Sequence, residues 1–535
     1  MKTLLMNGKV YLEREQFAEA VLVEDGVIQA VGSNEELKAM AGDAEVIDCE
    51  GKTVVPGFND SHMHLQNVGD SLYEVNIFGI GSIEDMVNRC QEYIAKYPER
   101  VWNGLVAAGW NQDIFAEKRM PNRHDLDRIS TEIPIILHRV CHHIAILNTK
   151  AIEILGMDET TPEIPGGEIQ REENGYPSGV FCELSAVVSQ AIQPRTDAQK
   201  REILAMAMDY AAHYGVTSVQ ANDLRTSDCY MENMALFQDL YKKGEAKTRY
   251  RAQASFGSAE ELREYVASGK FGPEQEVGDL FKMGPVKLFK DGSLGGRTAY
   301  MRKPYNDAPD TVGIETITVE DMDAFVQAAA DNNLQVATHV IGDRAISETL
   351  DAYEKSMKGG KNVLRHGLVH CQITDMDLLK RIAALDVLPM VQPVFLDYDM
   401  TVVEDRVGKD LAATSYAFKT MEDLGCHVSY GTDSPVEDCN PYWNLYAAVT
   451  RLTRGGQPEG GFYSNECVDI YTAVDAYTAG SAYTEFMEDK KGRIKPGYLA
   501  DMVVLNKDIF TIDPKEIRDM YAELTMMDGK IVYRR

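Results

Sequence analysis

The chain has 535 residues, of which 44% are hydrophobic and 26% are charged, a composition typical of soluble globular proteins and long enough for more than one domain. Its formal net charge is −30 and its sequence pI is about 4.8. Because an acidic surface attracts neither a nucleic-acid backbone nor an anionic membrane, we expect neither as a partner.

The first residues, MKTLLMNGKVYLERE, contain an apolar run that is too short for a signal peptide. No window of the sequence approaches the roughly 20 apolar residues that a membrane span requires. The nine cysteines are scattered and include no Cys-x-x-Cys pair, which argues against a disulfide framework and against a thiolate zinc site. We therefore expect a cytoplasmic protein.

Both ends of the chain predict short strands. Residues 1–56 contain GKVYL, AVLVEDGVIQAVG and AEVIDCEGKTVVPG, and the Asp25-Gly26 pair in an alternating apolar pattern predicts a hairpin. Residues 485–535 show the same pattern in ADMVVLNKD and in AELTMMDGKIVYRR, which turns at Asp528-Gly529. We expect the two ends to form one small composite β-sandwich domain.

The region between them, 57–484, alternates strand and helix. In ITVEDMDAFVQAAADNNLQVATHVIGD, Thr318 and Asp321 predict the start of a helix, and the strand that follows ends at His339. Repeated units of this kind predict a parallel sheet. Eight candidate strands, the number that closes a TIM-like (β/α)8 barrel, lie at 53–64, 216–221, 248–254, 286–290, 334–340, 367–371, 387–392 and 427–433. The gap after the first strand is too long for a simple connection, so 67–210 is predicted to be an insertion over the active-site mouth.

Two histidines alternate in the stretch KTVVPGFNDSHMHLQ. In an extended chain, residues i and i+2 point to the same side, so His62 and His64 can reach one metal ion. This pair alone leaves an alternative open, in which both histidines lie on the surface with their hydrogen bonds satisfied and bind no metal.

Further potential ligands lie at the ends of other predicted strands. These are Lys287 in GPVKLFKDGSLGG, His339 in VATHVIGDRA, His370 in GLVHCQ and Asp433 in YGTDSP. Chemistry in such barrels takes place at the C-terminal ends of the strands. A single histidine at a strand end is most often satisfied by a backbone partner, but four of the chain's eleven histidines at equivalent positions indicate a metal site.

Imidazole and carboxylate ligands suit zinc and similar divalent ions, and the absence of cysteine among them is typical of a catalytic site. A metal held in this way keeps a position for water and lowers the pKa of that water toward neutrality. Asp433 is the predicted catalytic base, because a carboxylate beside this water can take its proton and return it to a leaving nitrogen.

In these motifs the sequence resembles the amidohydrolase superfamily, and in particular the branch that contains N-substituted formamide deformylases and related metal-dependent amidohydrolases. PGFNDSHMH, VKLFKDGSLGGRTA, VATHVIGDRA and GTDSPV resemble its barrel motifs in order, and KGRIKPGYLADMVVL resembles its composite β-sandwich. GWNQDIFAEKRMPNRHDLD, HHIAILNTKAI and GGEIQREENGYPSGVFCE resemble its insertion. The resemblance implies one divalent metal on His62, His64 and Asp433, a second on His339 and His370, and a homodimer.

Lys287 requires a separate explanation, because an ammonium group has no lone pair and cannot bind a cation. In many members of the superfamily the matching lysine is carbamylated by CO₂, and the resemblance implies that Lys287 carries this carbamate as a ligand bridging two metals. Carbamylation requires the neutral amine, which burial favours. The alternative is a buried lysine paired with an acid such as Asp291.

Trp110 and His143 lie in the segments that resemble the insertion, and they are the predicted substrate-binding residues. Trp110 offers a broad apolar face and one donor, and His143 offers a hydrogen bond to a substrate oxygen or nitrogen. The alternatives are core packing for Trp110 and a hydrogen-bonded structural role for His143.

The leading functional hypothesis is a metal-dependent hydrolase of carbon–nitrogen bonds other than peptide bonds, in an amide or in an N-acyl or N-formyl amine. An isomerase or a decarboxylase is an alternative, because the same barrel and metals can stabilise an enolate or a carbanion. A small-molecule-binding relative that has lost catalysis is another, against which the complete ligand set argues. The sequence names neither the substrate nor the metal.

Overall fold

The computed structural model describes residues 2–139 and 143–535, which form two compact units. Unit 1 comprises the chain up to Asn67 together with Met208–Arg535, and unit 2 comprises Val68–Ala207. Unit 2 thus begins four residues after His64, in the region where the sequence predicts an insertion over 67–210. No helix among the described residues combines the length and the apolar character that crossing a membrane requires.

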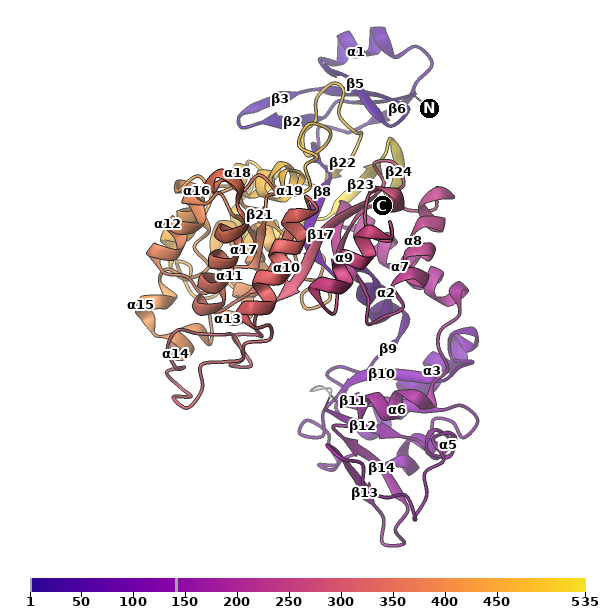
Figure 1. Ribbon diagram of the computed structural model, residues 1–535. Helices are drawn as coiled ribbons and strands as arrows, with labels where there is room; N and C mark the ends of the chain where they lie inside the picture. Colours follow the sequence, from indigo (N-terminus) through magenta and orange to yellow (C-terminus); the bar gives the residue numbers. More distant parts are fainter. Residues whose placement is uncertain (1, 140–142) are drawn as a thin grey trace. The chain divides into compact units, whose positions relative to one another are not determined.

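The centre of unit 1 is a parallel sheet of eight strands within the described residues, ordered as they follow in the chain (Figure 1). Its strands are β8 (Phe58–Met63), β15 (Val216–Arg225), β16 (Arg249–Ser255), β17 (Phe281–Phe289), β18 (Val336–Val340), β19 (Gly367–His370), β20 (Leu388–Val391) and β21 (Ser429–Tyr430). Backbone hydrogen bonds join its two edges, from Asp433 N to His62 O and from His64 N to Ser434 O, both at 2.8 Å. The sheet is therefore the nearly closed TIM-like barrel expected from the sequence.

Helices follow the barrel strands in the chain, as in βα units. The main ones are α8 (Tyr230–Lys242), α9 (Ala259–Ala267), α10 (Val319–Asp331), α11 (Asp343–Ser356), α12 (Met376–Ala384), α16 (Phe418–Asp423) and α17 (Pro441–Thr450). The Thr318 side chain caps α10 by accepting a hydrogen bond from Asp321 N at 3.1 Å, which confirms the helix start predicted from this pair.

The two ends of the chain build two further sheets of unit 1. One contains β1 (Lys2–Met6), β4 (Ala20–Glu24), β5 (Val27–Gly32) and β6 (Glu45–Asp48), and the other β2 (Lys9–Glu13), β3 (Gln16–Ala18), β7 (Thr53–Pro56), β22 (Met502–Leu505), β23 (Ala522–Met527) and β24 (Lys530–Arg534). Apolar side chains from both sheets share one buried cluster, which includes Leu5, Val21, Val54 and Met502. The turns at Asp25-Gly26 and Asp528-Gly529 have positive φ at both positions, as the predicted hairpins require.

The first predicted barrel strand, 53–64, proves to be two strands. β7 pairs with β2 and β22, whereas β8 starts the barrel beside β15. Gly57 separates them, and a Cβ at this position would lie 2.1 Å from Thr217 Oγ1. Only glycine permits so close an approach of β15. The apolar pattern runs on through Pro56-Gly57 and therefore does not reveal the change of sheet.

Unit 2 contains a sheet of six strands within the described residues. They are β9 (Val75–Asn76), β10 (Leu105–Trp110), β11 (Ile135–Arg139), β12 (Ile144–Leu147), β13 (Glu168–Arg171) and β14 (Pro177–Cys182), with helices α3 (Ile83–Lys96), α4 (Arg123–Asp127), α5 (Thr149–Ile154) and α6 (Ser185–Val188). Two clusters of buried apolar side chains, one of them around Trp110 and Phe115, form its own core.

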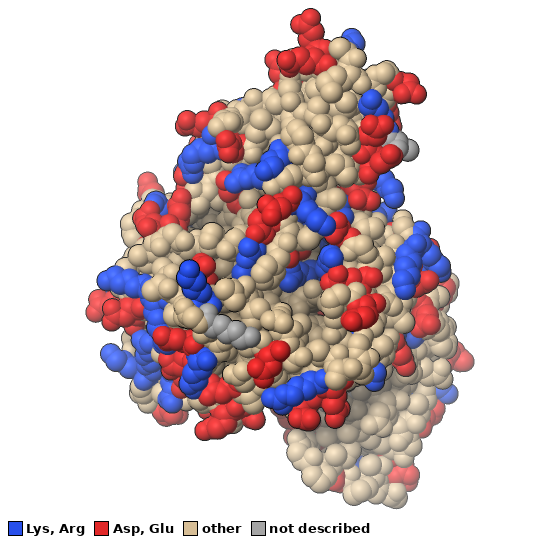
Figure 2. Space-filling view, turned by 45° about the horizontal axis from the view of Figure 1, so that its top comes forward, with Lys and Arg blue, Asp and Glu red and all other residues tan. Residues whose placement is uncertain are grey.

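The surface carries many charged side chains of both signs. Figure 2 shows Lys and Arg interspersed with Asp and Glu over the face in view. The net charge of −30 is thus a difference between two large populations of solvated charges, 54 basic and 84 acidic residues.

Candidate metal centre

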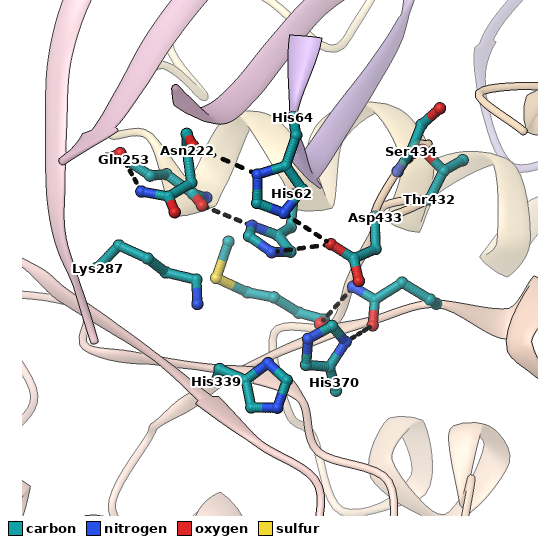
Figure 3. A network of polar contacts seen from close by, with 12 residues as sticks. His62, His64, Asn222, Gln253, Lys287, His339, His370, Thr432, Asp433 and Ser434 are labelled. Atoms are coloured by element: carbon teal, nitrogen blue, oxygen red, sulfur yellow. Dashed lines mark hydrogen bonds and ion pairs between the residues drawn. The ribbon is translucent and has the colours of Figure 1, made fainter. Parts of the chain in front are cut away.

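Six side chains predicted from the sequence converge on one space at the C-terminal ends of the barrel strands (Figure 3): His62, His64, Lys287, His339, His370 and Asp433. One ligand atom each from His62, His370 and Asp433 lies within 4.8 Å of the others, and all three residues are buried. The ring centroids of His339 and His370 are 4.4 Å apart. Parallel strands bring these residues together because each contributes its last positions to the same barrel end.

Burial keeps His62, His339 and His370 uncharged. It lowers the pKa of His62 to about 4 and that of His339 to about 3, and it places the pKa of His370 well below the ordinary value. A histidine must be uncharged to bind a metal, so these three imidazoles can bind a cation at neutral pH without first releasing a proton.

The Asp433 carboxylate faces two of the histidines. Its Oδ1 lies 3.2 Å from His62 Nε2 and 3.3 Å from His64 Nε2, and this oxygen is buried. His62 is neutral, and its Nδ1 carries the proton because it faces the Gln253 amide oxygen at 2.6 Å, so its Nε2 presents a lone pair to the carboxylate. A lone pair and a carboxylate oxygen repel each other unless a cation lies between them, so this arrangement fits a divalent metal.

Two buried glutamines hold two of the histidines by the opposite ring nitrogen. His62 Nδ1 lies 2.6 Å from Gln253 Oε1, and His370 Nδ1 lies 2.7 Å from Gln392 Oε1. Each glutamine amide nitrogen donates to a backbone carbonyl, at 3.0 Å and 3.1 Å, which keeps the amide oxygen turned toward the ring. An amide oxygen can only accept, so Nδ1 carries the proton and Nε2 remains as the ligand.

His339 is held by the loop that follows β17. Its Nε2 lies 2.9 Å from Gly292 O, which leaves Nδ1 for a metal. Asp291 fixes this loop, because its carboxylate accepts hydrogen bonds from the backbone N–H groups of Tyr300, Ile341 and Gly342 at 2.9, 3.0 and 2.7 Å. Burial raises the pKa of Asp291 to about 7 despite these hydrogen bonds.

His64 has two competing neighbours at Nδ1. The Asn222 carbonyl oxygen and the Arg225 Nη2 each lie 3.3 Å from this nitrogen. The carbonyl accepts a proton from Nδ1, whereas the guanidinium donates to it. Ligation of a metal through Nε2 requires the first arrangement.

Lys287 is almost fully buried, with 1% of its surface exposed. Its Nζ donates to Leu288 O at 3.2 Å and lies 3.6 Å from the centre of the Phe289 ring. Among the described residues no carboxylate lies within 4.0 Å of Nζ, so the alternative pairing with Asp291 is not found. Burial lowers the pKa of Lys287 to about 7.

Asp60 ties the first barrel strand to the segment after the last one. Its carboxylate accepts hydrogen bonds from His62 N at 3.1 Å, from Thr432 N and Oγ1 at 3.1 and 2.6 Å, and from Tyr477 Oη at 3.1 Å. Asp433 follows Thr432 directly in the chain. It has a φ of 56°, a conformation that few non-glycine residues adopt without support from their surroundings. Asp60 thus fixes the backbone from which the Asp433 carboxylate projects.

The two predicted substrate-binding residues lie in unit 2. Trp110, the last residue of β10, is completely buried in the core of this unit, and its indole N–H donates to Leu137 O at 2.8 Å. A side chain with no exposed surface cannot line a pocket, so the predicted substrate contact of Trp110 is wrong and core packing is correct. His143 is exposed and its Nδ1 lies 2.9 Å from a Glu183 carboxylate oxygen. Its role toward a substrate stays a prediction.

Sequence reasoning missed the acceptors that hold the ligands from outside, Gln253, Gln392 and Asn222, and it missed Arg225, which competes with Asn222 for His64 Nδ1. A signal for them exists, because each is a polar residue at, near or just after the C-terminal end of a barrel strand. The residue types alone did not distinguish them from ordinary barrel-filling side chains.

A parallel barrel with histidine and aspartate side chains gathered at its C-terminal strand ends is the arrangement of a metal-binding barrel. The model of the Amidohydrolase family matches residues 45–533, so the chain belongs to the amidohydrolase superfamily.

Individual relatives agree with this membership. The chain is 32% identical over 541 residues to a putative amidohydrolase, YtcJ, of Bacillus subtilis, with 100% of both chains covered. It is 26% identical over 549 residues to an N-substituted formamide deformylase of Arthrobacter pascens, covering 98% of this chain and 96% of the relative. The crystal structure of an uncharacterized metal-dependent hydrolase from Pyrococcus furiosus matches with a TM-score of 0.79 and 27% identity, covering 96% of this chain and 100% of the other.

Proposed function

We propose that the protein is a metal-dependent hydrolase of carbon–nitrogen bonds other than peptide bonds, with an amide or an N-acyl or N-formyl amine as its small-molecule substrate. The observation that carries the proposal is the buried Asp433 Oδ1 that faces His62 Nε2 and His64 Nε2 at 3.2 and 3.3 Å. The relative from Arthrobacter pascens supports it, because its name describes the removal of a formyl group from substituted formamides.

His62, His64 and Asp433 would hold one divalent metal, and His339 and His370 would hold a second, with zinc as the proposed ion. A set of neutral imidazoles with a carboxylate and no thiolate matches the ligands of catalytic zinc. Such a metal, when bound, supplies Lewis-acid polarisation and water that ionises near neutral pH.

The protein's own groups complete the reaction. Asp433 takes a proton from the attacking water and later delivers it to the leaving nitrogen. The water oxygen forms the new bond to the carbonyl carbon, the carbon–nitrogen bond breaks, and the products are a carboxylic acid and an amine. His143 is proposed to donate a hydrogen bond to the substrate.

Lys287 is proposed to carry a carbamate that serves as an anionic ligand. Its burial and the lack of a carboxylate partner in the described part of the chain support this assignment. Native mass spectrometry of the metal-loaded protein should show the added mass of one CO₂ per chain, lost on acidification. An unmodified lysine in fully loaded protein would contradict the assignment.

The function is tested by an activity screen of the metal-replete protein against N-acyl amines, N-acyl amino acids and lactams. Release of an amine together with the matching acid supports hydrolysis. A product of unchanged mass would indicate an isomerase, loss of CO₂ a decarboxylase, and binding without turnover a non-catalytic relative.

A further inference from the structure

Arg225 is the last residue of β15, so it stands at the barrel end where the metal centre is built. Its side chain is partly buried. Its Nη2 lies 3.3 Å from His64 Nδ1 and 3.4 Å from Asn222 O, and these are its only side-chain hydrogen bonds to the described residues. The same part of the chain offers no carboxylate within 4.0 Å of the guanidinium.

The buried arginines of unit 1 differ in their partners. Arg249 pairs with Asp501 at 2.6 Å. Arg251 and Arg451 have no carboxylate within 4.0 Å among the described residues; Arg251 donates to Gln335 Oε1 at 3.2 Å, and Arg451 donates to two backbone carbonyls at 2.6 and 2.8 Å. Asp223 is near Arg225 on the same strand, but its two carboxylate oxygens accept hydrogen bonds from the Gln66 backbone N–H and the Tyr250 hydroxyl, at 3.2 and 3.1 Å. Asp223 is close enough for the charge of Arg225 to oppose the rise in the pKa of its carboxyl group, but it forms no ion pair with Arg225 within 4.0 Å. The Nε and Nη1 donors of Arg225 find no acceptor among the described residues.

Metal binding by His64 frees the guanidinium further. Ligation through His64 Nε2 requires a proton on Nδ1, which then donates to Asn222 O at 3.3 Å. A protonated Nδ1 cannot accept a hydrogen bond from Arg225. In the metal-loaded protein the guanidinium retains only the longer contact to Asn222 O.

We propose that Arg225 is a specificity-determining residue that binds a carboxylate of the substrate next to the scissile carbon–nitrogen bond. The proposal rests on the proposed hydrolase function and narrows its substrates to N-acyl amines that carry a carboxylate, as N-acyl amino acids do. The guanidinium fork matches a carboxylate with two parallel hydrogen bonds. Because Arg225 touches His64, the bound carboxylate lies about one side chain from the ligands of the centre.

The test compares substrates that differ in one charge. The substrates are N-acetyl and N-formyl amino acids with small, large and aromatic side chains, in both enantiomers. Each acid is paired with the compound in which a primary amide replaces its carboxylate. The variants are Arg225→Gln and Arg225→Lys. Arg263→Gln is the matched control, because Arg263 is an exposed residue of α9 whose partner is Glu260 at 3.3 Å, and its loss removes the same charge.

We expect the wild-type protein to prefer the acid over its amide by about tenfold or more in kcat/KM, the worth of a charged hydrogen-bonded pair. Arg225→Gln should abolish this preference by raising KM for the acids while leaving the amides nearly unchanged, and Arg225→Lys should restore part of it. Arg263→Gln should behave as the wild type. Metal content should be the same in all four proteins.

A second readout does not depend on turnover. Calorimetric titration of metal-loaded Asp433→Asn protein with an acid and with its amide should show tighter binding of the acid, and the added Arg225→Gln change should remove the difference. Equal affinities for acid and amide, or a loss shared equally by both after Arg225→Gln, would overturn the proposal. If the wild type hydrolyses no pair, the hydrolase function fails and the titration still decides the role of Arg225.

Discussion

The ligand atoms of the metal centre are selected by acceptors that lie outside it. Gln253 Oε1 and Gln392 Oε1 take the Nδ1 protons of His62 and His370, at 2.6 and 2.7 Å. A neutral amide fixes the tautomer without adding a charge, unlike the carboxylates that often play this part. Because Gln253 and Gln392 are neutral, the net charge of the ligand set depends on Asp433 and on whether Lys287 is modified.

Gln253→Leu and Gln392→Leu should each lower metal affinity by about 10–100-fold, because the histidine loses the acceptor that holds its tautomer and orientation. Gln253→Glu and Gln392→Glu should retain binding. The affinity is measured by competition with a chromophoric chelator.

Gln220→Leu serves as the control for these variants. Gln220 is equally buried in β15, but it donates to Ser481 O and Thr484 Oγ1 and contacts no histidine of the centre. The Gln220→Leu variant should have a lower free energy of unfolding, and the metal affinity of the folded protein should be unchanged. An equal loss of affinity in all three leucine variants would show a general effect of barrel packing instead.

Asp433→Asn should lower kcat by about two to four orders of magnitude, because an amide keeps the shape of the carboxylate but cannot accept the proton of water. Substantial metal should remain bound, since His62 Nε2 and His64 Nε2 are unaffected. Steady-state kinetics and elemental analysis on the same sample check both parts. A variant with near-native kcat would remove Asp433 from the role of base.

At the scale of elements, the loop after β17 connects two ligand-bearing strands. Lys287 precedes it in β17, and its Gly292 carbonyl holds His339 of β18 at 2.9 Å. The buried Lys290 anchors the base of the loop by ion pairs to Glu315 and Glu348, at 2.6 and 2.9 Å. The glycine-rich segment at this point is thus a support for a ligand, which its composition alone did not indicate.

Gly292→Ala should move this support. A Cβ at Gly292 would lie 2.2 Å from Thr298 Oγ1 and 2.6 Å from Thr298 Cβ, so the loop must shift and carry the carbonyl away from His339. We expect a loss of about 1–3 kcal/mol in unfolding free energy, typical of overpacking, together with weaker metal binding. Denaturant unfolding and metal titration measure the two effects.

Gly295→Ala is the control in the same loop. The nearest atom to a Cβ there is Tyr398 Cε1 at 3.6 Å, an ordinary contact, so stability and metal binding should both stay close to the wild type. If Gly295→Ala is as damaging as Gly292→Ala, mobility of the loop, not the position of one carbonyl, governs the site.

At the scale of the whole molecule, the sequence predicts what depends on local pattern. A few adjacent residues determine strand ends, helix caps and Asp-Gly hairpins. For this reason the barrel and the converging ligands could be predicted. The partners of those ligands are not local, since His62 and Gln253 are 191 residues apart. Nor could the pattern distinguish a core tryptophan from a pocket tryptophan, because Trp110 lies in an apolar strand of unit 2 in either case.

The ligands of the metal centre lie far apart in the chain, between His62 and Asp433. They come from β8, β17, β18, β19 and the segments after β8 and β21, so the site exists only in folded unit 1. A metal at 100 times its Kd should then stabilise this unit by about 2.7 kcal/mol.

Elemental analysis of protein purified without chelators should find one to two equivalents of zinc.

Removal of the metal should act locally. The one group of His, Cys, Asp and Glu side chains that satisfies metal-binding distances among the described residues lies in unit 1, so hydrogen exchange should increase at the C-terminal ends of β8, β17, β18 and β19. The sheet of β9 to β14 in unit 2 should keep its protection, because its core of Trp110, Phe115 and their neighbours contains no ligand. Equal deprotection of both units would mean that they unfold as one, and unchanged exchange in unit 1 would place the metal elsewhere.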